Sequence, residues 1–193
     1  MKATVHPVDG VPGPQDNSWV DAVLTALGAE AIPAGALIAR PLGVGPGAVV
    51  AFWTDDAPVA GCTAGPVTVG PGVPYEIASH QAGTSAGPAR YLQLTTFGGR
   101  GDEWCAAFDR SGQERVWPAV KDVPGLVGVL VGAAPGARVA VTLADSVEAL
   151  EAGAAAILST ELLPWEDPAH LTGPEQLAIL RLVHADVPAG ATR

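Results

Sequence analysis

Residues 37–56, LIARPLGVGPGAVVAFWTDD, decide the fold, because the same pattern returns as residues 126–145, LVGVLVGAAPGARVAVTLAD. Each stretch places a Pro-Gly pair between two apolar runs rich in β-branched residues, a pattern that predicts a hairpin. Laid over each other without a gap, the two are identical at Leu37/Leu126, Gly43/Gly132, Pro46/Pro135, Gly47/Gly136, Ala48/Ala137, Val50/Val139, Ala51/Ala140 and Asp56/Asp145. A repeat of about ninety residues predicts two copies of one supersecondary unit.

The first copy reads as strand, helix, hairpin and closing strand. Residues 2–8 alternate as a strand does, and Ser18 is placed to cap a helix that Gly28 ends. Residues 57–74 are too rich in Gly and Pro to hold a second helix, so we expect a loop there. Residues 75–81 then predict the closing strand, and GTSAGP at residues 83–88 is typical of a linker.

The second copy predicts a complete unit. Residues 91–97 form a strand, Asp102 starts a helix that Gly112 breaks or bends, and the hairpin follows. Asp145 and Ser146 with Glu148 resemble a capping box before the next helix. A long loop at residues 159–174 and a closing strand at residues 177–184 complete the order β-α-β-β-α-β, the ferredoxin-like arrangement.

The closing strands extend the comparison, since EIASHQA at residues 76–82 lies over LRLVHAD at residues 180–186 and pairs His80 with His184. That offset is 104 residues, against 89 in the hairpin, and the difference of 15 is about the size of one helix. We therefore predict an α+β protein of two tandem ferredoxin-like units. The expected units are residues 1–88, degenerate because a loop replaces the second helix, and residues 89–193, which are complete.

The amino-acid composition argues against some classes of binding partner. Twenty acidic residues against ten basic ones give a net charge of −10, which opposes nucleic acid and anionic membrane surfaces as partners. Only 16% of residues are charged, below the roughly 25% usual for soluble domains, which predicts that much of the surface is covered by a partner or lines a cavity. An oligomer such as a homodimer is therefore expected. Neither a signal peptide nor a run of about 18 apolar residues is present, so a cytoplasmic protein is expected. Cys62 and Cys105 have no metal spacing and read as small buried hydrophobes.

Three stretches resemble a known family. They are VWPAVKDVPGLVGVLVG at residues 116–132, VVAFWTDDA at residues 49–57, and the closing strands that end near His80 and His184. Together they resemble the dimeric α/β-barrel superfamily and, within it, the antibiotic-biosynthesis-monooxygenase-like proteins. The resemblance implies two ferredoxin-like units whose sheets enclose an α/β barrel, here supplied by one chain.

The resemblance also implies a function. It predicts an apolar pocket between sheet and helices for a polycyclic aromatic or quinone-type molecule, which some members of the family oxidise with O₂ and without a cofactor. Trp53 matches the family's strand-end Trp by position, and Arg181 matches its strand-four Arg. The first functional hypothesis is thus a cofactor-independent monooxygenase, an oxidoreductase acting on an apolar aromatic or polyketide-type metabolite.

Candidate site residues follow from their chemistry. Trp53 suits stacking on an aromatic ligand, although burial at the edge of the core explains it as well. His80 and His184 could act as bases near neutral pH, or could be structural histidines. With Arg181 these three are the catalytic candidates.

The remaining candidates are binding residues. The loop at residues 159–174 carries the densest group of ligand-capable side chains, Trp165, Glu166, Asp167 and His170, and loops of this length often serve as lids. Trp165 and His170, with Tyr75 at the start of a closing strand, are the ligand-binding candidates. No metal site is predicted, because the spacing fits no ligand pattern.

A second functional hypothesis is a non-catalytic small-molecule-binding or assembly protein of the same fold. It is motivated by the unlike halves and by a missing Asn. The resemblance implies that the oxygenases use an Asn with the Trp and the Arg, and Asn17, the only asparagine of the chain, stands before the first helix.

Overall fold

The chain forms two compact units, and two of its strands are divided between them. The structure, a computed structural model, describes residues 1–13, 15–29 and 31–188. Its contacts divide the chain into unit 1, Met1–Ser79 with Ile179–Arg193, and unit 2, His80–Ala178. The division passes through β6 (Val73–Ala82) and β10 (Gln176–Asp186), so each of these strands contributes residues to both units. The boundary at residue 88 follows from the sequence repeat rather than from contacts, and it stays a prediction.

Unit 1 is built from β1 (Lys2–Asp9), α1 (Trp19–Leu27), β2 (Gly35–Pro41) and β3 (Gly47–Trp53), with parts of β6 and β10. Its strands pair antiparallel in the order β10-β2-β3-β1-β6. The hairpin predicted at residues 37–56 is β2 and β3. Every residue of β3 is buried, which explains why this strand reads as a continuous apolar run rather than an alternating one.

The core of unit 1 lies between its sheet and α1. Apolar side chains of α1 pack against the alternate residues Val49, Ala51 and Trp53 of β3. The helix was expected because its apolar residues recur at one-face spacing, and the structure buries four of them, Trp19, Val20, Val23 and Leu27.

Two details of unit 1 differ from expectation. Residues 57–74 form no helix, as predicted, but they hold a short hairpin rather than a loop, β4 (Cys62–Ala64) and β5 (Val67–Val69), turning at Gly65 with φ +58°. Ala64, Val67 and Val69 join the core under α1, so burial stabilises a hairpin that Gly and Pro content disfavours. Ser18 precedes α1 but does not cap it.

The Ser18 hydroxyl is engaged elsewhere. It donates to Asp16 Oδ1 at 2.6 Å, and the Ser18 amide donates to the same oxygen at 2.9 Å. An Asp two residues upstream therefore competes successfully with the helix for this side chain. The prediction of a side-chain cap at Ser18 was wrong for that reason.

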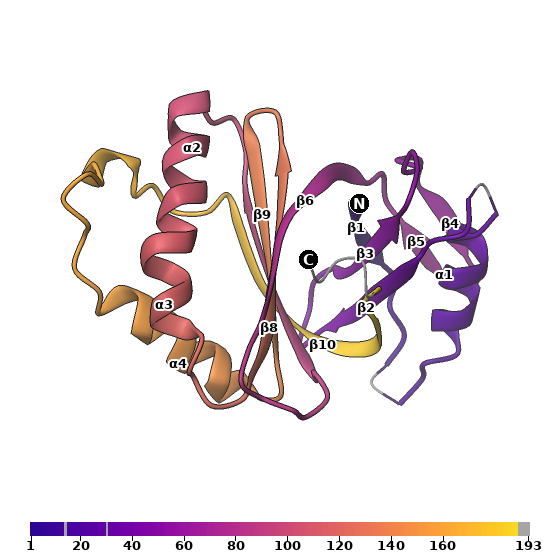
Figure 1. The fold of residues 1–193 in the computed structure, drawn as a ribbon. Coiled ribbons are helices and arrows are strands. Elements are labelled where there is room, and N and C mark those ends of the chain that lie inside the picture. The colour runs from indigo at the N-terminus through magenta and orange to yellow at the C-terminus, as the bar shows by residue number, and fades with distance from the viewer. Residues whose placement is uncertain (14, 30, 189–193) are drawn as a thin grey trace. The chain divides into compact units, whose positions relative to one another are not determined.

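Unit 2 contains β7 (Tyr91–Phe97), α2 (Asp102–Ser111), β8 (Leu126–Ala134), β9 (Ala137–Ala144) and α4 (Val147–Leu158). Its strand order is β10-β7-β9-β8-β6. If only β1, β2, β3 and β6 are counted in unit 1, and β7, β8, β9 and β10 in unit 2, the orders β2-β3-β1-β6 and β8-β9-β7-β10 are both second, third, first, fourth. The helices α2, α3 (Trp117–Val120) and α4 lie on one face of the β7–β9 sheet (Figure 1). The predicted α+β class with ferredoxin-like units is confirmed.

In unit 2, a helix break, a helix cap and a turn occur where the sequence predicts them. At Gly112 the α-helix gives way to a π-helical turn, Gly112–Val116, followed by α3 (Trp117–Val120). Ser146 caps α4 by accepting from the Ala149 amide at 3.3 Å. Gly136, which turns β8 into β9, has φ +67°, a conformation that glycine adopts without strain.

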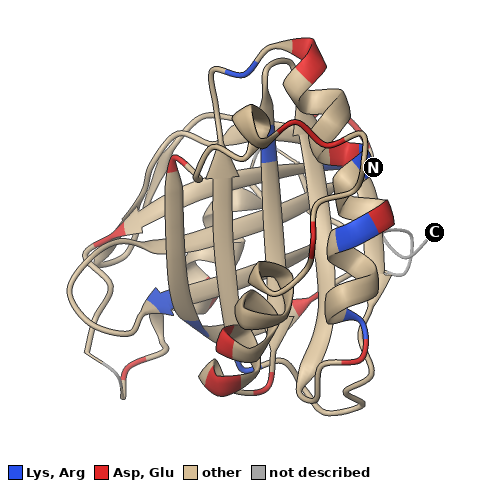
Figure 2. Cartoon of the chain, turned by 90° about the vertical axis from the view of Figure 1, so that its left-hand side faces the viewer, with Lys and Arg blue, Asp and Glu red and all other residues tan. Residues whose placement is uncertain are grey.

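Charged residues are sparse in the sheets, whose ribbons are largely uncoloured in Figure 2. No Asp, Glu, Lys or Arg occurs in β3, β7 or β8. The few charged strand positions therefore stand out as candidates for a specific role.

Candidate functional site

The sheet of unit 2 has two unlike faces. On the face away from the helices, Leu94, Leu130 and Val141 are buried and stand in neighbouring positions of β7, β8 and β9. The opposite face is the one toward the helices, because Phe97 of β7 packs against Trp104 of α2 and Arg138, opposite Phe97 on β9, bonds to Asp109 of α2. Six residues in the middle of this face are only partly buried: Gln93, Thr95, Val129, Val131, Ala140 and Thr142. Side chains on the central strand of a sheet that stay partly exposed leave room for solvent or a ligand.

The open face is arranged in rows across the three strands. Gln93, Thr142 and Val129 form one row, and Thr95, Ala140 and Val131 form the next, as the strand register requires. Three strands span about 10 Å, and two residues along a strand about 7 Å. We call these six residues the open face; it is large enough to support a fused-ring molecule.

The open face combines apolar area with a few polar groups. Val129, Val131 and Ala140 supply apolar surface, and the Gln93 amide donates to Thr95 Oγ1 at a long 3.4 Å. Thr142 adds a second hydroxyl beside Gln93. An apolar wall with a small number of hydrogen-bonding groups is the usual lining of a small-molecule site.

These polar residues were not predicted as a site. The signal was present, because YLQLTTF places Gln93 and Thr95 at alternate positions of an apolar strand. Thr142 was noted only as the counterpart of Trp53 in the second copy. Comparing the polar residues that alternate with apolar ones along β7 and β9 would have found all three.

Trp53 lies in the core of unit 1 between the sheet and α1. It is 2% exposed, and its indole Nε1 donates to Thr4 Oγ1 at 2.9 Å, with Thr4 fully buried. Packing and this hydrogen bond account for the residue. Its predicted contact with a ligand stays a prediction.

Arg181 and Trp53 are not brought together by the strand register. Arg181 stands opposite Arg40 on β2, whereas Phe52, the neighbour of Trp53, stands opposite Gly35 at the other end of β2. Five residues of strand separate these positions, about 17 Å. Arg181 itself is exposed.

The histidines occupy half-buried positions in different units. His80 belongs to unit 2, and a Cβ placed on Gly128 of β8 would lie 3.4 Å from its Nε2, so glycine at 128 makes room for the imidazole. His184 belongs to unit 1, stands opposite Ile38, and follows an irregularity in the β10 register. Tyr75 of β6 is 6% exposed and stands opposite Ala3. Catalytic or ligand-binding roles for these residues stay predictions.

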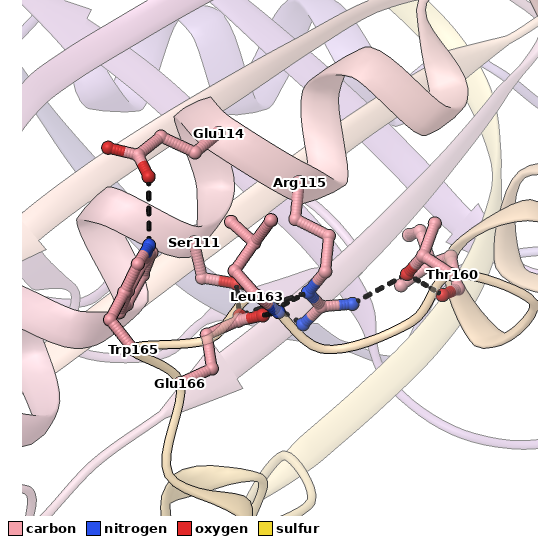
Figure 3. Close-up of polar contacts among 8 residues, drawn as sticks. Ser111, Glu114, Arg115, Thr160, Leu163, Trp165 and Glu166 are labelled. Atoms are coloured by element: carbon pink, nitrogen blue, oxygen red, sulfur yellow. Dashed lines mark hydrogen bonds and ion pairs between the residues drawn. The ribbon is translucent and has the colours of Figure 1, made fainter.

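The loop predicted as a lid is fastened to the helices by Glu166. The Glu166 carboxylate, 4% exposed, accepts from Arg115 Nε at 2.8 and 2.9 Å, from Ser111 Oγ at 2.5 Å and from the Leu163 amide at 2.8 Å (Figure 3). Arg115 also donates to Thr160 Oγ1 at 2.8 Å. Burial raises the pKa of Glu166, but these donors outweigh it and leave the pKa below its ordinary value.

Trp165 and His170 belong to the same attachment. The Trp165 indole donates to Glu114 at 3.0 Å and lies under the Arg110 guanidinium, 4.0 Å from the ring centre. The His170 carbonyl accepts from Trp104 Nε1 at 2.8 Å. Both candidate binding residues thus hold the loop to the α2 segment.

His6 is a buried titratable residue that the sequence reading missed. It is fully buried on β1, its Nδ1 lies 3.0 Å from the Gly70 carbonyl, and its Nε2 has no hydrogen-bond partner among the described residues. Because a carbonyl only accepts, the Nδ1 carries the proton. Burial lowers the pKa of His6, opposed by the Gly70 contact.

The described residues contain neither a metal-binding cluster nor a membrane-spanning helix. No group of three His, Cys, Asp or Glu side chains in that part of the chain is placed to hold a metal ion. None of its helices is long and apolar enough to cross a membrane.

Comparison with known proteins places the fold. No family model matches the sequence, and no curated protein matches it. Among solved structures, an uncharacterised ferredoxin-fold protein of Listeria monocytogenes, related to antibiotic biosynthesis monooxygenases, aligns with a TM-score of 0.58, covering 96% of this chain and 95% of its own at 10% identity. The chain has the ferredoxin-like fold of monooxygenase-like proteins.

Two further structures share this fold. An anthrone oxidase-like protein aligns with a TM-score of 0.53 at 15% identity, covering 95% of this chain and 92% of its own. A heme-degrading enzyme of Listeria monocytogenes aligns with a TM-score of 0.52 at 8% identity, covering 94% and 99%. The resemblance inferred from the sequence is confirmed at the level of the fold. Sequence identities this low do not show that the proteins share a substrate or a mechanism.

Proposed function

We propose that this protein binds a small, flat, largely apolar molecule through the open face of unit 2. The observation that carries the proposal is the partial exposure of Gln93, Thr95 and Thr142 beside Val129 and Val131 in the middle of an otherwise apolar sheet. An aromatic ring system would cover the apolar area, and a carbonyl or hydroxyl on it would bond to the Gln93 amide or the threonine hydroxyls.

Binding is tested with anthrone as the probe, by fluorescence titration of the whole chain. Thr142→Val keeps the side-chain shape and removes the hydroxyl, so anthrone should bind about 2- to 10-fold more weakly if the hydroxyl bonds to it. Thr63→Val is the matched control, because Thr63 is exposed on strand β4 of unit 1. Saturable binding that Thr142→Val and Gln93→Leu leave unchanged would refute the site.

A second candidate function is cofactor-independent oxidation of the same kind of molecule. It is favoured by the likeness, over 95% of the chain, to a protein described as anthrone oxidase-like. Aerobic incubation with anthrone should then consume O₂ and produce a quinone. Binding of anthrone without O₂ consumption would indicate a non-catalytic binding protein. The separation of Trp53 from Arg181 favours this outcome.

The expected homodimer belongs to the same proposal. Sedimentation of the whole chain over a range of concentrations measures it directly, and a mass of one chain throughout would exclude it.

A further inference from the structure

Arg40 and Arg181 stand directly opposite each other on the antiparallel strands β2 and β10 of unit 1. Directly opposite side chains project from the same face of a sheet, with their Cβ atoms about 5 Å apart, and like charges in such a pair repel each other. The chain has twice as many acidic as basic residues, so composition does not force two cations into this position. The pair therefore requires a physical explanation.

Arg40 is a buried cation without a carboxylate bonded to it. It is 4% exposed, and its guanidinium donates to the Gly13 carbonyl at 3.0 Å, the Asp16 carbonyl at 2.7 Å and Asn17 Oδ1 at 3.1 Å. All three acceptors are neutral groups. Its Nε is buried and has no acceptor in the part of the chain that the structure describes. A buried charge balanced only by neutral dipoles is incompletely compensated.

Asp16 supplies the nearby negative charge. Hydrogen bonds from the Ser18 hydroxyl and amide lower the pKa of the Asp16 carboxyl, and the charge of Arg40 contributes a smaller effect in the same direction. The carboxylate is thus ionised, but it bonds to Ser18 rather than to either arginine. The negative charge near Arg40 is thus already bonded to Ser18.

Arg181 is exposed, and its side chain makes no hydrogen bond or ion pair with any described residue. Its guanidinium offers a planar pair of N–H donors, the geometry that matches the two oxygens of a carboxylate or phosphate group. An anion from solvent can therefore reach Arg181 directly.

We propose that Arg181 and Arg40 form a binding site for a small oxyanion, the carboxylate or phosphate group of a ligand. Arg181 supplies the hydrogen bonds, and Arg40 supplies a fixed positive charge held in place by the loop before α1. Ile38, two residues before Arg40 on β2, packs into the core under α1, so the site lies on the α1 face of the unit 1 sheet. It is separate from the open face of unit 2 and does not depend on the function proposed above.

The test measures the melting temperature of the whole chain in chloride, phosphate and acetate at equal ionic strength and pH 7. Because a ligand that binds the folded state raises its stability, phosphate or acetate should give a saturable rise over chloride. A response to phosphate alone would identify a phosphate site, and a response to acetate alone a carboxylate site.

Two variants decide whether the arginine pair is responsible. Arg181→Gln should abolish the saturable rise, and Arg181→Lys should weaken anion binding about tenfold by removing the bidentate geometry. Arg90→Gln, which removes an exposed arginine of unit 2, should respond as the unmodified chain does. The proposal is wrong if neither anion gives a saturable rise, or if the rise survives in Arg181→Gln.

Discussion

Arg115 and Glu166, 51 residues apart in the sequence, form an ion pair in which one nitrogen, Arg115 Nε, lies 2.8 and 2.9 Å from the two carboxylate oxygens. Both side chains are nearly buried, 11% and 4% exposed. Arg115 stands in the π-helical turn, and Glu166 stands in the long loop after α4. The π-helical turn is a rare distortion of a kind often found at functional sites. It is thus bonded to the long loop in which the sequence predicted ligand-binding residues.

Removing the Glu166 carboxylate should destabilise the protein strongly. In Glu166→Ala the charge of Arg115 stays nearly buried without a partner, which costs about 3–5 kcal/mol. Urea unfolding at pH 7 measures the change in the free energy of unfolding. Asp56→Asn, which breaks the exposed ion pair with Lys2, is the control and should have no measurable effect. If the two substitutions lower the free energy of unfolding equally, the nearly buried Arg115–Glu166 pair contributes no more to stability than the exposed pair does.

Stability should fall as the pH decreases below the ordinary pKa of histidine, because of His6. The pKa of His6 in the folded protein is lowered by burial, so below about pH 6.5 the unfolded chain takes up a proton that the folded chain does not. Val49, Gly70 and Gly72 lie next to His6, and none of them ionises. From pH 7.5 to 5.5 the loss should be about 1 kcal/mol.

The check compares urea unfolding at these two pH values with the same measurement on His6→Gln. The substituted chain should lose about 1 kcal/mol less over the same interval, since the titrating group is gone. An identical pH dependence in both proteins would exclude His6 as the cause.

Trp53→Phe should reduce stability and leave ligand binding unchanged. The substitution leaves the fully buried Thr4 hydroxyl without its donor, at a cost of about 1–3 kcal/mol. Adding Thr4→Val should recover part of that loss, because both polar partners are then removed. Unfolding and anthrone titration are measured on the same variants. Weaker anthrone binding at unchanged stability would instead support the ligand contact predicted from the sequence.

The sequence predicted the fold better than the site, for a physical reason. Strand and helix positions depend on local patterns, such as the apolar run of residues 47–53, so the two hairpins and three longest helices were anticipated. The hairpin β4–β5 was missed because its residues Ala64, Val67 and Val69 are stabilised by contact with α1, distant in sequence. Local sequence patterns do not show burial by residues that are distant in sequence.

Which candidate residues lie close together depends on the strand register, which the sequence does not show. Trp53 and Arg181 look compatible as single residues, and only the pairing of β2 with β3 and β10 shows that they lie at opposite ends of a strand. The same register brings Arg40 opposite Arg181, and Gln93 opposite Thr142, pairs separated by 141 and 49 residues in the sequence. Neither pair has a local signature.

Gly72 and His6 should be energetically coupled. A Cβ on Gly72 would lie 2.5 Å from His6 Nε2 and 2.8 Å from Nδ1, far closer than packed atoms allow, and the ring is fully buried. Gly72→Ala should therefore destabilise the protein by about 1–3 kcal/mol through overpacking. In a His6→Ala background the ring is absent, so the same glycine substitution should cost much less. The coupling from a double-mutant cycle in urea should be about 0.5–3 kcal/mol. Additive effects would mean that the two residues do not touch, and would overturn the placement of the β5–β6 turn on β1.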